Sequence, residues 1–229
     1  MDIEVPELSE TAAILEPEAR VTRGSSRPDP VRGAVSLGLP VVQTINEGLV
    51  GDDAALRSFL VREGSAWRFH LVHLACSFTP GGDASFGQAL LTVRLARDDG
   101  VAEPPPIAWS LTPQRAERAV ERSRTVKIGA KLVLEMAVEM QASGQHNEVF
   151  VESYGLQEPT CSWEFNRTSL DEISGTQRLA LVARIPSDCL VTGTVDLRAT
   201  LTRRRLGMFP YRMALENDRP LSFTLSGRT

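Results

Sequence analysis

The stretch Thr125–Gln141, which reads TVKIGAKLVLEMAVEMQ, decides how this chain is interpreted, because apolar residues occupy every second position along it. A period of two predicts a β-strand with one face on a core and the other face in water. At about 3.3 Å per residue the strand would be about 50 Å long, whereas ordinary strands have about 3 to 10 residues. We therefore expect it to form the spine of a sheet and to bend at Gly129.

An α-helix is the alternative for the same stretch. Its charged residues recur every four positions and would form one polar stripe along a helix. Against the helix, Gly129 lies inside the stretch, and β-branched residues such as Ile128 and Val133 favour a strand. We therefore favour the strand and keep the helix as the alternative.

Most of the remaining chain is divided into short apolar or alternating segments that are separated by Gly, Pro, Asn, Asp and Ser. Many short strands with turn signals at regular spacing predict a mainly β protein, an antiparallel β-sandwich or two packed β lobes. The expected strands are Val31–Gln43, Trp67–Phe78, Phe86–Leu95, Ile107–Leu111, Val149–Tyr154, Thr160–Phe165, Arg178–Ile185, Val191–Thr202, Tyr211–Leu215 and Leu221–Leu225.

One or two short surface helices complete the expected fold. The first follows Asp52 and Asp53, whose charges suit the positive end of a helix, and it carries Leu56, Phe59 and Leu60 on its apolar face. The second is expected over residues 114–124, with Thr112 as its N-cap and Pro113 at its first position.

The two ends of the chain differ in composition. Residues 1–30 are predicted to be a flexible acidic N-terminal arm, because they hold a run of acidic residues and then a linker rich in Gly, Ser and Pro. Residues 31–229 are predicted to form the β-sandwich domain, which could divide into 31–113 and 125–229.

The composition disfavours several classes of protein. A net charge of −4 argues against general attraction to nucleic acid or anionic membranes. The sequence contains no run of about 18 apolar residues, so it predicts no transmembrane helix. It also has no recognisable secretory signal, so we expect a cytoplasmic protein. Arginines outnumber lysines by 23 to 2, which suggests a bacterial genome with high GC content.

The sequence predicts no catalytic residue, no cofactor and no metal site. The three cysteines are far apart and have no metal-ligand spacing, so they are expected to be small buried residues. His70 and His73 are three positions apart on an expected strand and would point to opposite faces. Buried, hydrogen-bonded histidines are the interpretation we favour.

Electrostatic complementarity between the termini gives the one functional surface that the sequence predicts. Residues 1–18 contain six acidic and no basic residues, whereas residues 198–212 contain five arginines and no acidic residue. Basic and aromatic side chains together are typical of a docking surface. The predicted partner-binding residues are Arg198, Arg203, Arg204, Arg205, Met208, Phe209, Tyr211 and Arg212, with the apolar Ile14 and Leu15 in the arm.

These observations favour a non-catalytic interaction or assembly module, a bacterial subunit of a larger complex or a homo-oligomer. Its partner would be another protein or a second copy, bound through the acidic arm and the arginine cluster, with no nucleic acid and no stable membrane insertion. One alternative is a membrane-active β protein of the pore-forming type, in which the alternating stretch enters a bilayer as a hairpin. Another is an enzyme whose site is assembled from residues distant in sequence.

Overall fold

A computed structural model describes residues 2–4, 6–17, 31–82, 84–116, 125–127, 148–205 and 209–227. Within these residues the helices are α1 (Glu47–Val50) and α2 (Ala54–Glu63). The strands are β1 (Asp2–Glu4), β2 (Glu10–Pro17), β3 (Val31–Gly38), β4 (Val41–Ile45), β5 (Trp67–Phe78), β6 (Ala84–Arg97), β7 (Ile107–Thr112), β8 (Arg115–Ala116), β9 (Thr125–Lys127), β10 (Val151–Tyr154), β11 (Thr160–Asn166), β12 (Gly175–Pro186), β13 (Leu190–Arg205), β14 (Phe209–Asn217) and β15 (Leu221–Ser226).

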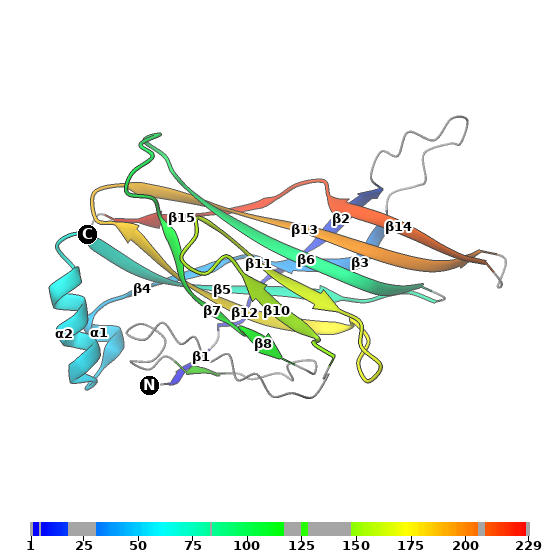
Figure 1. Cartoon of the computed structure of the whole chain (residues 1–229), viewed down its shortest axis with the longest axis horizontal. Coiled ribbons are helices and arrows are strands. Elements are labelled where there is room, and N and C mark those ends of the chain that lie inside the picture. The colour runs from blue at the N-terminus through cyan, green and yellow to red at the C-terminus, as the bar shows by residue number, and fades with distance from the viewer. Residues whose placement is uncertain are drawn as a thin grey trace.

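Thirteen of these strands form one antiparallel sheet, so the mainly β fold with two short helices is confirmed. The strand order is β7-β12-β5-β3-β2-β14-β13-β6-β11-β10-β8, with β4 beside β5 and β15 beside β13. Strands from before residue 117 and strands from after residue 147 are interleaved in this order (Figure 1). They therefore contribute to the same core.

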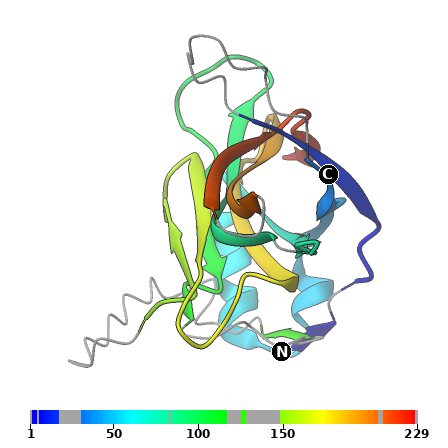
Figure 2. The ribbon, with the colours of Figure 1, turned by 90° about the vertical axis from the view of Figure 1, so that its right-hand side faces the viewer.

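The sheet curls around one large apolar core instead of forming two separate hydrogen-bonded sheets (Figure 2). Its two terminal strands, β7 and β8, are consecutive in the chain. The turn after β10 also contacts β7: the Gln157 amide donates to the Ala108 carbonyl at 2.7 Å, and the Ala108 amide donates to the Glu158 carbonyl at 3.0 Å. These bonds bring the ends of the strand order together and nearly close the sheet.

β5 is covered on both faces, as its uninterrupted apolar sequence predicts. Val72 and Leu74 point into the main core. Phe69 and Leu71 face a second, smaller cluster under α2. Asp53 begins α2 as its N-cap by accepting a hydrogen bond from the Leu56 amide at 3.0 Å.

The helix predicted over residues 114–124 is not found at its start, where the prediction is wrong. Arg115 and Ala116 form β8 and pair with Glu152 and Val151 of β10. Pairing across the sheet therefore overrides the local helix signal at this point. The rest of that range, residues 117–124, lies outside the described residues.

The long alternating stretch is described only at its beginning. Its first three residues form β9, which pairs with β1 of the N-terminal segment in a separate two-stranded sheet. Residues 128–147 lie outside the described residues, so the choice between strand and helix there stays a prediction.

Part of the predicted N-terminal arm belongs to the sheet. β2 pairs with β3 on one side and with β14 on the other, and Ala13 and Leu15 are buried in the core. Residues 10–17 are therefore an integral strand, which corrects the view of the whole arm as a free extension. Residues 18–30 lie outside the described residues.

Candidate functional site

The predicted arginine surface lies on β13 and β14, two long strands that are joined as a hairpin at one end of the molecule (Figure 1). We call residues 198–205 together with 209–216 the C-terminal ribbon. Of the predicted contact residues, Met208 lies outside the described residues. The predicted arginines and aromatic residues occupy register positions on the ribbon: Arg198 opposite Glu216, Thr202 opposite Arg212, Arg203 opposite Tyr211, Arg204 opposite Pro210 and Arg205 opposite Phe209.

The charge of Arg198 is paired within the chain. Its Nε lies 3.2 Å from Glu216 Oε1 and 3.8 Å from Asp196 Oδ2, and its side chain is half-exposed. Beside it is a shallow groove of about 180 Å³ between β6 and the ribbon, and the groove is lined by Glu164, Thr200 and Leu215 among others. Arg198 therefore closes the inner end of the ribbon with a local ion-pair network.

The structure brings the arm and the ribbon together through backbone pairing. Glu16 of β2 is the register partner of Glu216, which in turn lies opposite Arg198 on the next strand. Leu15 is fully buried and Ile14 is half-buried, and the Asp218 amide donates to the Ile14 carbonyl at 3.0 Å. Leu15 is thus a core residue of this chain, and its predicted role as a docking residue could be exercised only if β2 left the sheet.

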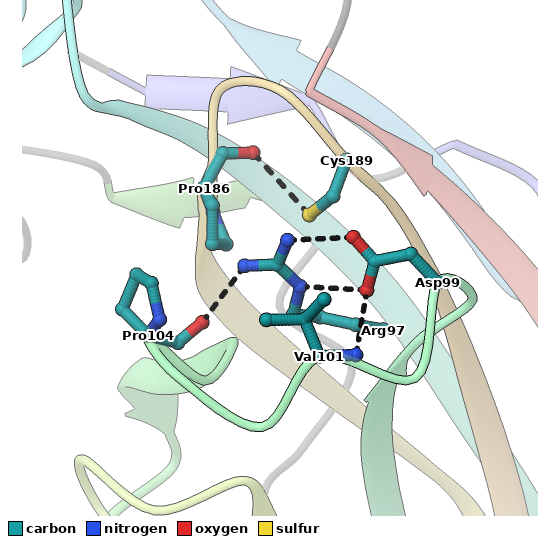
Figure 3. A network of polar contacts seen from close by, with 6 residues as sticks. All are labelled: Arg97, Asp99, Val101, Pro104, Pro186 and Cys189. Atoms are coloured by element: carbon teal, nitrogen blue, oxygen red, sulfur yellow. Dashed lines mark hydrogen bonds and ion pairs between the residues drawn. The ribbon is translucent and has the colours of Figure 1, made fainter.

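A second polar site, which the sequence did not reveal, lies where β6 ends and the turn between β12 and β13 begins (Figure 3). Arg97 donates from Nε to Asp99 Oδ1 at 2.9 Å, from one terminal nitrogen to Asp99 Oδ2 at 2.6 Å and from the other to the Pro104 carbonyl at 3.3 Å. The Val101 amide donates to Asp99 Oδ1 at 3.0 Å. A hollow of about 590 Å³ next to this network is also lined by Asp188.

This network holds a loop and keeps Arg97 and Asp99 paired with each other. The bonds from Arg97, followed by the Val101 amide, lower the pKa of Asp99 to about 2. In return, the hydrogen bond to Asp99 raises the pKa of Arg97. Both groups are therefore charged and paired at neutral pH. The sequence indicates a charged turn at residues 97–100. It does not indicate whether Asp98 or Asp99 pairs with the guanidinium group of Arg97.

Cysteines and metal-binding side chains are further candidates for chemistry among the described residues. All three cysteines are buried free thiols, and burial raises the pKa of Cys161 to about 12 and that of Cys76 further. Within the described part of the chain, no group of three His, Cys, Asp or Glu side chains could hold a metal ion. No helix among the described residues has the length and apolar character of a membrane span.

Comparison with known proteins identifies no family for this chain. No protein-family model matches the chain, and no curated protein matches its sequence. Among solved structures, Clostridium perfringens delta-toxin is similar over 95% of this chain and 86% of its own chain, with 6% sequence identity and a TM-score of 0.31. At that TM-score the likeness carries no argument about what this chain does.

Proposed function

We propose that this chain is a non-catalytic interaction or assembly module that binds an acidic protein segment, on a partner or on a second copy, through the C-terminal ribbon. The observation that supports it most is the register of the ribbon. Arg203, Arg204 and Arg205 lie opposite Tyr211, Pro210 and Phe209, which carry no negative charge. Opposite charges on cross-strand neighbours stabilise such residues, and β14 offers no acidic residue at these three register positions. This arrangement supports an acidic segment of another molecule as the partner.

The edge of β14 adds a second reason. β14 pairs with β13 from Phe209 to Glu216, but β2 pairs with it only from Leu215 to Asn217. Among the described residues, the edge of β14 from 209 to 214 therefore has no neighbouring strand. An open edge offers backbone hydrogen bonds to an extended segment, and the arginines would favour an acidic one.

A peptide of this chain's own residues 1–18 is the natural probe, because it holds six acidic residues and no basic one. We expect the full-length protein to bind the labelled peptide in fluorescence anisotropy, with affinity that falls as the salt concentration rises. A peptide with all six acidic residues replaced by Gln or Asn should bind much more weakly. Light scattering of the protein alone shows whether copies associate in the same way.

Two triple variants make the same change of charge, one within the ribbon and one outside it. The triple variant Arg203→Glu, Arg204→Glu and Arg205→Glu should abolish peptide binding and any self-association. The control replaces three exposed arginines outside the ribbon with Glu, namely Arg62, Arg167 and Arg219, and should leave both unchanged. The proposal would be contradicted if the protein stayed monomeric at every concentration and did not bind the peptide. Equal effects of the two triple variants would also contradict it.

A membrane-active β protein is the second candidate, and one observation favours it. β8 and β10 are antiparallel neighbours in the sheet, and the alternating sequence of residues 125–141 lies in the chain between them. Such a connection has the topology of a hairpin, and a bilayer requires only about 9–11 residues per tilted strand. The difficulty is the return strand, because few alternating residues separate Gln141 from β10.

Dye release from vesicles tests this second candidate. Vesicles of phosphatidylcholine alone, and of phosphatidylcholine with phosphatidylserine, are loaded with a fluorescent dye and exposed to the protein at pH 5 and pH 7.5. A membrane-active chain should release dye, and Leu134→Asp should prevent the release because a charge on the apolar face opposes insertion. No release under any of these conditions would eliminate this candidate.

A further inference from the structure

Arg184 of β12 lies between two tryptophans on the outer face of the sheet. The centre of its guanidinium group is 4.2 Å from the ring centroid of Trp67 and 4.6 Å from that of Trp109. β12 is the middle strand of three, with β5 carrying Trp67 on one side and β7 carrying Trp109 on the other. Each neighbouring strand therefore supplies one indole to one side of the guanidinium group. We call these three residues the Trp–Arg–Trp site.

The Trp–Arg–Trp site is built on packed elements. Trp109 is in contact with Phe59 of α2 at 6.4 Å and with Phe69 of β5 at 5.9 Å between ring centroids. Both phenylalanines are buried in the small cluster beneath α2, and both tryptophans pack against that cluster while staying half-buried. The site is thus held rigidly at the boundary between core and solvent, where aromatic and arginine side chains make the strongest binding contacts.

The guanidinium group of Arg184 has no polar partner among the described residues. Its Nε is buried and makes no hydrogen bond. Burial lowers the pKa of Arg184, and the charge of Glu63 opposes that effect. Among the described residues Glu63 forms its ion pair with Arg62, whose Nε donates to its Oε1 at 3.0 Å, and not with Arg184.

Stacking between rings accounts for the position of Arg184 but leaves its hydrogen bonds unmade. Cation–π attraction holds the flat faces of a guanidinium group, whereas its N–H groups lie in the plane of the group and point to its edge. In Arg184 the Nε edge is enclosed. The donors that remain for a ligand are the two terminal amino groups at the end of the side chain. Two parallel N–H donors match the two oxygens of a carboxylate in spacing and in plane.

We propose that the Trp–Arg–Trp site binds a carboxylate, which accepts hydrogen bonds from the two terminal amino groups of Arg184 between the indole rings. A carboxylate group, which brings one negative charge to the guanidinium, fits better than a phosphate group, which brings up to two, because Glu63 adds a negative charge nearby. The carboxylate can belong to a small acid or to an acidic residue of a peptide. This site is separate from the C-terminal ribbon and does not depend on it.

Tryptophan fluorescence tests the proposal, because two of the three tryptophans of the chain form the site and the third, Trp163, is fully buried. The full-length protein is titrated at constant ionic strength with glutarate, with an acetylated tetraglutamate peptide and with inorganic phosphate. We expect saturable changes with at least one carboxylate probe and weaker binding of phosphate. Glutarate and the peptide distinguish a small acid from a protein segment as the natural source.

Variants separate binding from folding. Arg184→Lys keeps the positive charge but loses the two parallel N–H donors, so it should weaken carboxylate binding about tenfold or more. Glu63→Gln removes the nearby negative charge without touching the guanidinium and should strengthen binding about two- to threefold. Arg167→Lys, at a surface ion pair elsewhere, should change nothing, and circular dichroism checks that every variant is folded. An absent response, unchanged affinity in Arg184→Lys or tighter binding of phosphate than of both carboxylates would overturn the proposal.

Discussion

At the scale of single residues, Gly193 shows how closely the strands approach in this fold. Gly193 of β13 lies opposite Phe223 of β15, and a Cβ atom at this position would be 2.2 Å from Phe223 Cζ. Phe223 is itself buried, so its ring has little room to move. We expect Gly193→Ala to lower the free energy of unfolding by about 1–3 kcal/mol, measured by urea denaturation. Gly81→Ala is the control, because a Cβ there meets no atom within 4 Å, and an equal effect of both changes would contradict the prediction.

The ion pair of Arg97 with Asp99 predicts a dependence on acid. The pKa of Asp99 is about 2 in the folded chain, below its ordinary value of 3.8. A carboxyl group whose pKa is lowered by folding stabilises the protein at every pH above the group's ordinary pKa. That contribution is lost as the pH falls from about 4 through about 2. Asp99→Asn removes the contribution, so its melting temperature should change less than that of the unmodified protein over this range. Parallel curves for the two proteins would contradict the assignment.

Neither residue-scale site could be read from the sequence. The turn signal at Asp98, Asp99 and Gly100 was visible, but the hollow beside it also needs the turn at Asp188, far along the chain. Trp67, Trp109 and Arg184 are likewise distant in sequence and meet only because β5, β12 and β7 are adjacent. Register between strands is a long-range property that local alternation does not supply.

At the scale of elements, most strands of the large sheet were predictable to within a few residues, because they carry their own alternation or apolar run. β5 has the predicted bounds, whereas the single strand predicted over Val31–Gln43 is divided at Pro40 into β3 and β4, because proline cannot donate a hydrogen bond to a neighbouring strand. The helix over residues 114–124 was mispredicted at its start, since β8 gains its bonds from β10 and not from neighbours along the chain. Local propensity decides an element only where no distant strand competes.

His70 and His73 attach β4 to β5 and predict a second effect of pH. His70 Nε2 donates to the Ser226 carbonyl at 3.1 Å and its Nδ1 accepts from Thr44 Oγ1 at 3.3 Å. His73 Nε2 donates to Gln43 Oε1 at 3.1 Å, but its buried Nδ1 has no hydrogen-bond partner. Burial lowers the pKa of both histidines below the ordinary 6.5, so protonation is costly in the folded state.

The stability contributed by the neutral histidines is complete above about pH 6.5 and decreases as the pH falls below that value, because the unfolded chain binds protons first. We expect the free energy of unfolding to decrease between pH 7 and pH 5. The double variant His70→Gln and His73→Gln should have a flatter profile over this range, although it is less stable at pH 7. Urea denaturation at each pH measures both, and identical slopes would contradict the prediction.

At the scale of the whole molecule, the curl of the sheet depends on a strand that the sequence placed in a flexible arm. β2 lies between β3 and β14 and so joins the N-terminal strands to the C-terminal ribbon. Its apolar run, residues 12–15, is only four residues long, does not alternate and lies between Glu10 and Glu16, so considered alone it does not indicate a strand. Ala13 and Leu15 nevertheless point into the core, and Ser77 Oγ of β5 donates to Glu10 Oε1 at 2.7 Å.

Leu15→Ala tests whether β2 is part of the fold or a removable arm. The Leu15 side chain is fully buried in the main core, so its truncation should lower the free energy of unfolding by about 2–5 kcal/mol. Leu170→Ala is the control, because Leu170 is 72% exposed and should change stability little. If both variants unfold at the same urea concentration as the unmodified protein, β2 behaves as a free arm. If only Leu15→Ala is destabilised, residues 10–17 cannot be removed without opening the core, and tests of partner binding must use the full chain.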